Sequence, residues 1–171
     1  MSEKMRGMKY FSVIVLAAFL TVFAAGLLWA QTTEGDVKDL YKFMELRTKL
    51  QEKIKDSERS KILFSLGEYY YKTNDMYDTK RVFEDFIVKN PGGITAILAR
   101  VYLYKIAISS KSTERSAKLK KEIFQEQFIL LFDKFKTLAY NSVFGSKYEV
   151  HYFVDRIEVY LNGEIFERIS P

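Results

Sequence analysis

The sequence of 171 residues predicts a mainly helical fold that ends in a β-hairpin. Two observations carry this prediction. From residue 36 to residue 140, apolar side chains recur at spacings of three and four, which is the period of amphipathic helices. Near the C-terminus the period changes to two, and Asn162-Gly163 separates two alternating runs, which is the strongest short-range signal for a hairpin.

The helical part divides at turn residues such as Asn74-Asp75 and Pro91-Gly92. We predict about five helices, at residues 36–55, 59–73, 76–90, 94–109 and 114–140. The hairpin is predicted at residues 157–169, because Val, Ile, Tyr and Phe dominate there. An alternative for residues 155–161 is a short helix that ends at Asn162-Gly163. The predicted organisation is a targeting segment at 1–30, a helical domain at 31–143 and the hairpin segment at 144–171.

Residues 1–30 have the composition of a targeting segment. Basic residues precede a run from Tyr10 to Ala30 that contains no charge. Its length of about 20 residues suits a bilayer-spanning helix, and the same run fits a signal peptide cleaved before Gln31. The chain has no cysteine, which excludes a lipoprotein anchor. We expect the rest of the chain to be periplasmic or elsewhere in the cell envelope, either free or anchored to the inner membrane through residues 10–30.

Residues 60–93 contain a helix-turn-helix pattern with ordered special positions. Gly67 removes a side chain where the next helix crosses closely. Asn74 tolerates a left-handed conformation in the turn, and Asp75 can cap the second helix. The positions that carry the pattern are Leu63, Leu66, Gly67, Tyr70, Thr79, Phe83, Phe86 and Pro91.

This pattern resembles the tetratricopeptide repeat (TPR), and in particular repeats of exported envelope-assembly proteins. Phe86 departs from the family, which generally has a small residue there. Residues 94–140 have the size of a second, degenerate repeat. The resemblance implies TPR-like helical hairpins that act as a binding scaffold for another protein.

In such repeats the first helix forms the binding face. The matching positions here, spaced three and four apart along one side of the helix, are Lys61, Phe64, Glu68, Tyr71 and Lys72. We therefore predict that these residues bind a partner protein. The alternative is that Phe64 and Tyr71 pack under the helix at 36–55.

The residues used most often in catalysis and metal binding are scarce. His151 is the only histidine, and it lies in an alternating run typical of a strand. There is no cysteine nucleophile, no second histidine for a metal and no glycine-rich phosphate loop. We expect no catalytic residue, no cofactor and no metal site. A two-carboxylate glycosidase remains an alternative, because composition does not exclude it.

The expected function is therefore that of an exported scaffold or adaptor that binds another envelope protein. The alternative is a structural subunit of a larger envelope machine, such as a motor, secretion or pilus assembly, in which the hairpin adds to a neighbour's sheet. The net charge of +5 falls to +3 without residues 1–30, because that segment carries three basic residues and one acidic residue. This weak excess and the expected export both lead us to expect no nucleic-acid partner. The sequence does not predict the oligomeric state.

Overall fold

The structure, a computed structural model, describes residues 34–132 and 137–171. The predicted signal peptide or anchor at residues 1–30 lies outside the described residues. The chain divides into two units between residues 42 and 43, and helix α2 (Glu34–Lys49) crosses this boundary. In the first unit, Glu34 and Asp36 lie in the first turn of α2, where carboxylates stabilise the positive end of the helix dipole.

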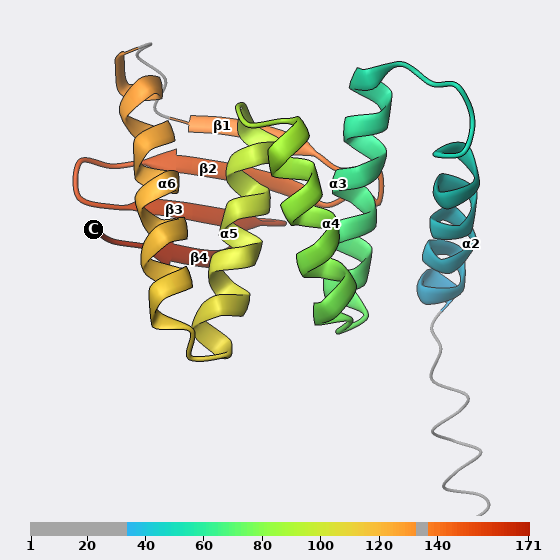
Figure 1. The fold of residues 1–171 in the computed structure, drawn as a ribbon, viewed down its shortest axis with the longest axis horizontal. Coiled ribbons are helices and arrows are strands. Elements are labelled where there is room, and N and C mark those ends of the chain that lie inside the picture. Colours follow the sequence, from blue (N-terminus) through green and yellow to red (C-terminus); the bar gives the residue numbers. More distant parts are fainter. Residues whose placement is uncertain (1–33, 133–136) are drawn as a thin grey trace, which may run out of the picture. The chain divides into compact units, whose positions relative to one another are not determined.

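The second unit contains the helical pairs and a four-stranded antiparallel sheet. The helices are α3 (Asp56–Lys72), α4 (Met76–Lys89), α5 (Ile94–Ser109) and α6 (Thr113–Phe132). The strands are β1 (Thr137–Asn141), β2 (Lys147–Tyr152), β3 (Ile157–Leu161) and β4 (Glu164–Ile169), and they lie in the order β1-β2-β3-β4. Helices α3 to α6 form one layer over one face of the sheet (Figure 1). The predicted mainly helical fold with a C-terminal hairpin is confirmed.

The α3–α4 pair has the features that the sequence predicted for its turn. Asn74 adopts a left-handed conformation with φ of 62°. The carboxylate of Asp75 accepts a hydrogen bond from the backbone N–H of Asp78 at 3.0 Å and so caps α4. A Cβ atom added to Gly67 would lie 2.6 Å from Cε1 of Phe83. The two helices therefore cross at a distance that only glycine at position 67 allows without movement of Phe83.

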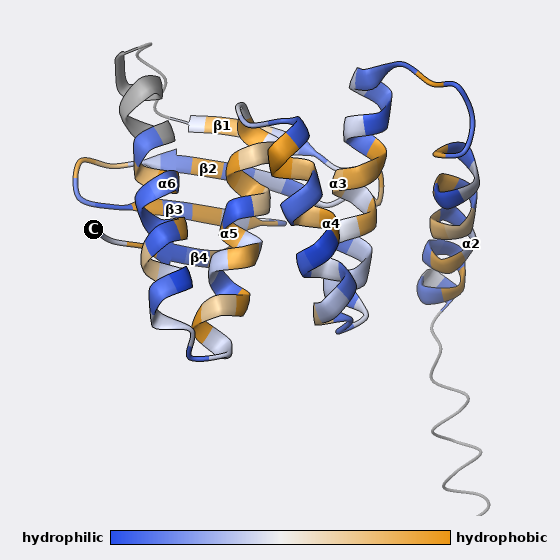
Figure 2. Ribbon diagram, in the orientation of Figure 1, coloured by the Kyte–Doolittle hydropathy of each residue, from blue (hydrophilic) through white to orange (hydrophobic). Residues whose placement is uncertain are grey.

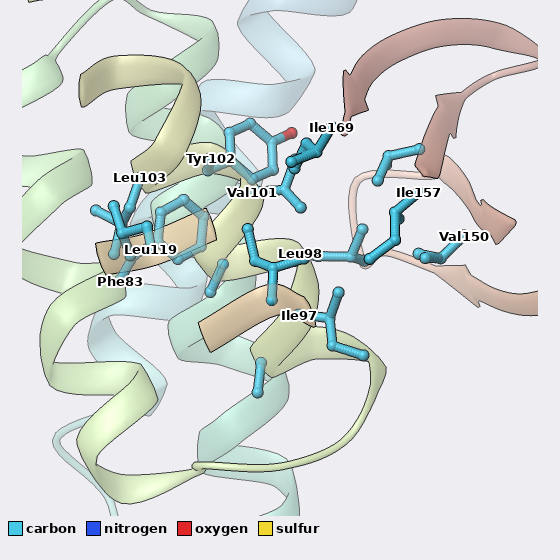
Figure 3. Close-up of a cluster of buried hydrophobic side chains, with 14 of the residues drawn as sticks. Phe83, Ile97, Leu98, Val101, Tyr102, Leu103, Leu119, Val150, Ile157 and Ile169 are labelled. Carbon is cyan, nitrogen blue, oxygen red and sulfur yellow. The ribbon is translucent and has the colours of Figure 1, made fainter. Parts of the chain in front are cut away.

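Helix α5 is the centre of the core. Its residues from Ala96 to Leu103 are all buried, so it has no solvent-facing side over this stretch. Figure 2 shows α5 as largely hydrophobic, whereas α6 carries many hydrophilic residues. Leu98 and Val101 of α5 point toward Ile157 of the sheet (Figure 3). The helix thus joins the sheet on one side to the other helices on its other side.

The predicted hairpin is confirmed at β3–β4. Asn162 and Gly163 have φ values of 54° and 86°, which are the two positive values that a type I′ turn requires. The alternative short helix at 155–161 is wrong, because Ile157–Leu161 pairs with strands on both sides. Cross-strand pairing with two neighbours outweighs the local preference that an Asn-Gly helix cap would supply.

Two predicted helix ends are also wrong. The first helix ends at Lys49 rather than near residue 55, and Arg59 of α3 donates a hydrogen bond from Nη1 to the carbonyl of Leu50 at 3.4 Å. This guanidinium satisfies a carbonyl at the helix end. The last helix ends at Phe132 rather than near residue 140, because Thr137–Asn141 pairs with β2 as a strand. Sheet pairing there overrides the apparent helical period.

A smaller cluster joins the C-terminal half of α2 to α3 within the second unit. Phe43 and Leu46 are buried against Ile62 and Leu66. Phe43 also stacks on Tyr69, with ring centroids 4.2 Å apart. This face of α3 is distinct from the face predicted to bind a partner, which lies toward the sheet.

Candidate functional site: one face of helix α3 and the groove at its end

The five residues predicted to bind a partner lie in three environments along α3. Lys61 and Lys72, toward the two ends of the helix, are exposed. Phe64 and Glu68, in the middle, are buried, with 0% and 7% of their surfaces exposed. Tyr71, near the C-terminal end, is half-buried. The five residues therefore share one side of the helix, but the middle of that side is buried.

The chain's own sheet covers the middle of this face. The ring of Phe64 meets Tyr140 of β1 edge-to-face at a centroid distance of 5.3 Å, and Tyr148 of β2 at 6.0 Å. Phe64 also packs on Phe83 of α4 at 5.6 Å. The covering element is thus the sheet rather than the helix at 36–55. A partner would contact Phe64 only if the sheet moved, so protein binding at this position stays a prediction.

A buried polar network fixes the sheet to α3. The carboxylate of Glu68 accepts hydrogen bonds from the Tyr148 hydroxyl at 2.9 Å and from the Ser142 hydroxyl at 3.1 Å. The hydroxyls of Tyr148 and Tyr102 lie 2.6 Å apart. Because Tyr148 gives its single proton to Glu68, Tyr102 is the donor in the bond between the two tyrosines. Helices α3 and α5 and strand β2 therefore meet at one hydrogen-bonded chain.

Burial controls the protonation of these tyrosines. Removal from water raises the pKa of Tyr148 and of Tyr102 well above that of an exposed tyrosine. Burial also raises the pKa of Tyr140 to about 12, with a smaller contribution from the negative charge of Glu68. All three hydroxyls therefore stay protonated at neutral pH, and those of Tyr148 and Tyr102 act as hydrogen-bond donors. The network is a structural tie between layers rather than an exposed acid–base site.

The C-terminal end of α3 is open, unlike its middle. Tyr71 packs edge-to-face on Tyr102 at 4.7 Å, and its remaining surface borders a groove. The groove has a volume of about 400 Å³ and is lined by Tyr71, Asn74, Met76, Lys80, Ile106, Ser109 and Ser110. The lining residues come from the end of α3, the α3–α4 turn, the first turns of α4 and the end of α5. The groove is therefore formed where the two helical pairs meet.

The groove combines an apolar wall with one cation. Tyr71, Met76 and Ile106 supply the apolar surface, and the unbranched Met side chain adapts readily to different ligands. The hydroxyls of Ser109 and Ser110 are engaged with backbone carbonyls of α5. Lys80 forms no ion pair with a carboxylate in the described part of the chain. An apolar group accompanied by a negative charge matches this lining.

The sheet face away from the helices carries a second polar cluster. Glu158 accepts hydrogen bonds from Nε of Arg156 at 2.9 Å, from Nε of Arg168 at 2.8 Å and from the Tyr160 hydroxyl at 2.8 Å. The hydrogen bond from Arg156, followed by that from Tyr160, lowers the pKa of Glu158 to about 2. This carboxylate is fully engaged by its neighbours. The cluster clamps β3 to β4 and leaves Glu158 with little capacity for a ligand.

His151 lies on β2, on the same outer side of the sheet, as its alternating sequence context predicted. Its Nε2 atom lies 2.9 Å from Oε2 of Glu149. Within residues 34–132 and 137–171, no group of three or more His, Cys, Asp or Glu side chains is arranged to hold a metal ion. In the same ranges, none of the helices combines the length and the apolar composition needed to cross a bilayer.

The sequence pattern predicted one residue of the groove and did not predict the others. The pattern placed Tyr71 on the predicted binding face. It gave no indication that Ile106, Ser109 and Ser110, at the end of α5, would be neighbours of Tyr71. No local motif marks these three residues; only the packing of the two helical pairs brings them together. The alternating run from Tyr148 did indicate a strand, yet nothing in that run indicates that the strand would cover Phe64.

No family model matches the chain, no curated protein matches it, and no solved structure matches it.

Proposed function

We propose that this chain is an exported scaffold of the cell envelope that binds another envelope protein through the groove at the end of α3. The observation that carries the proposal is the groove itself, which is open, mainly apolar and bordered by a residue of the predicted binding face. The close crossing of Gly67 and Phe83 supports a TPR-like reading of the α3–α4 pair. Such pairs are binding scaffolds in the family that the sequence resembles.

The residues that line the groove indicate which kind of protein segment it would bind. A volume of about 400 Å³ falls in the range of protein pockets that receive small ligands or a few side chains. Tyr71, Met76 and Ile106 would contact an apolar side chain of the partner, and Lys80 would pair with a carboxylate beside it. Lys72 lies one residue beyond Tyr71 and adds positive charge near the same end of α3. The proposed ligand is therefore a protein segment with an apolar residue next to an acidic one.

The groove is tested by cross-linking followed by direct binding. A photo-reactive amino acid at Lys80, in the full chain expressed in its own cells, should form an adduct with one envelope protein. The purified partner should then bind Lys80→Glu about tenfold more weakly than the natural chain, which corresponds to about 1.4 kcal/mol. Lys121→Glu, a matched charge reversal at an exposed position of α6, should leave the affinity unchanged. Equal affinities for both variants would contradict binding at the groove.

Export rests on the uncharged run at residues 10–30, which lies outside the described residues. We expect a reporter fused after Pro171 to be active only if the reporter works outside the cytoplasm. A reporter active only in the cytoplasm would contradict export. The N-terminal residue of the isolated protein distinguishes the two forms: Gln31 indicates a cleaved signal peptide, and an intact N-terminus indicates a membrane anchor.

The second candidate function is a structural subunit of a larger envelope machine. One observation favours it: the sheet has an edge strand, β1, that pairs on one side only among the described residues. Such an edge can add to the sheet of a neighbour. The groove and the edge are separate surfaces, so the two candidates can be tested independently.

A further inference from the structure

The two edges of the sheet differ in how they are protected from pairing with other chains. Strand β4 carries the charged residues Glu164, Glu167 and Arg168, and its pairing with β3 is irregular between Val159 and Tyr160. The backbone carbonyl of Phe166 on this strand accepts a hydrogen bond from Lys105 at 3.0 Å. Charges, an irregular register and a side chain on the edge backbone are the usual means by which proteins block strand addition.

Strand β1 has none of these protections within the part of the chain that the structure describes. Its sequence, TLAYN, contains no charge and no proline, and its register with β2 is regular over all five residues. Among the described residues, β1 pairs with β2 alone. In an antiparallel pair, alternate residues turn their N–H and C=O groups away from the partner strand. The outer side of β1 therefore presents backbone donors and acceptors in the spacing that an extended chain can match.

The side chains of β1 indicate what such an extended chain would contact. Leu138 and Tyr140 face the helices and pack against the main core, yet both remain only partly buried. The other three residues of β1 are uncharged, are small or of moderate size, and are exposed on the opposite face of the sheet: Thr137, Ala139 and Asn141. An added strand with apolar residues at alternate positions would complete the burial of Leu138 and Tyr140. No charge on β1 would select or repel it.

We propose that β1 accepts an extended segment of another protein, with apolar residues at alternate positions, as a fifth strand of the sheet. The occupant is a single segment rather than a second copy of this chain. Figure 1 shows the first turns of α3 projecting past β1. The helical layer of a second copy paired antiparallel to β1 would lie on the same side of the sheet and meet these turns, whereas an isolated strand has no such layer. Recognition is mainly through the backbone, with alternating apolar side chains over Leu138 and Tyr140. This inference deepens the second candidate function, on which it rests through the β1 edge, and it uses none of the groove residues, so its failure would leave the groove proposal standing.

The first part of the test compares the two edges in the full chain in its own cells. A photo-reactive amino acid at Ala139 should form an adduct with another protein. The matched position on the protected edge is Ile165, which is also exposed, and it should form none. Absence of an adduct at Ala139, equal adducts at both positions, or an adduct between two copies of this chain would each overturn the proposal.

The second part separates strand addition from mere side-chain contact. A synthetic peptide that covers the cross-linked segment is added to the purified full chain, and backbone hydrogen exchange is measured. Exchange should slow at alternate amides of β1, while the amides of β2 keep their protection. Methylation of the peptide amides that face β1 should abolish binding, and methylation of those that face away should not. Unchanged exchange in β1, or equal binding of both methylated peptides, would overturn the proposal.

Discussion

The middle and the end of helix α3 present the same side-chain pattern to different surroundings. Phe64 in the middle is fully buried against two tyrosines of the sheet, whereas Tyr71 near the end is half-buried and borders an open groove. Helical periodicity determines that both residues lie on one face. It does not determine what covers that face, because the covering residues Ser142 and Tyr148 lie 74 and 80 residues after Glu68.

The largest expected difference between the two regions is in stability. Phe64→Ala should lower the free energy of unfolding by about 3–5 kcal/mol, because it removes a fully buried ring and leaves a cavity under the sheet. Met76→Ala, which truncates an apolar side chain in the groove, should cost less than about 1.5 kcal/mol, since Met76 is only partly buried. Denaturant unfolding of both variants measures the difference. Similar losses for the two variants would contradict the contrast.

The next effect concerns the neighbouring side of α3, where Gly67 packs on Phe83 of α4. Gly67→Val should destabilise the chain toward the upper end of about 1–3 kcal/mol, because the new Cβ would lie 2.6 Å from the Phe83 ring. Gly92→Ala is the control, because an added Cβ there meets nothing within 4 Å. Thermal melting of both variants is the measurement. An unchanged melting curve for Gly67→Val would argue against the close crossing.

A smaller effect is expected from the polar network. Tyr148→Phe keeps the ring but removes the hydroxyl that links Glu68 to Tyr102. The loss should be about 1–2 kcal/mol, because buried polar groups lose a hydrogen-bond partner. Tyr77→Phe, at a position that is 77% exposed, should be neutral. Urea unfolding measures both free energies. If neither substitution lowered the free energy of unfolding, the network would not be holding the sheet to the helices.

The smallest expected effect appears only at alkaline pH. The pKa of Tyr140 is raised to about 12 by burial, above the ordinary value near 10 of the unfolded chain. The unfolded state therefore loses its proton first, so the contribution of Tyr140 is fully present below about pH 10 and is lost as pH rises from about 10 to 12. Tyr140→Phe should show a weaker decline in stability over this interval. Identical pH profiles for the two proteins would place the Tyr140 hydroxyl in water.

The sequence was sufficient for elements whose signals are local. Gly67, Asn74 and Asp75 each act on neighbours within the α3–α4 pair, and the Asn162-Gly163 turn acts on the strands that flank it. These features were predicted because their causes, a missing side chain, a left-handed residue and a cap, are written at single positions. The groove residue Tyr71 was predicted for the same reason, since its position on the helix face follows from spacing.

Elements that depend on distant partners could not be predicted in the same way. Thr137–Asn141 continues an apolar helical pattern, and only its pairing with β2 makes it a strand. The burial of Glu68 likewise depends on hydroxyls from the far end of the chain. From the sequence alone, Glu68, between Phe64 and Tyr71, looks like part of a solvated helix face. Its role becomes apparent only when the sheet is placed over it.

The sheet covers the middle of α3 and leaves its end open. The most direct test is nuclear Overhauser contacts in the purified full chain with selectively labelled Phe and Tyr. The Phe64 ring should show cross-peaks to the rings of Tyr140 and Tyr148, whose centroids lie 5.3 and 6.0 Å away. A soluble paramagnetic reagent should broaden Met76 in the groove and spare Phe64. Absence of the cross-peaks together with broadening of Phe64 would show that the face is open and would contradict the account.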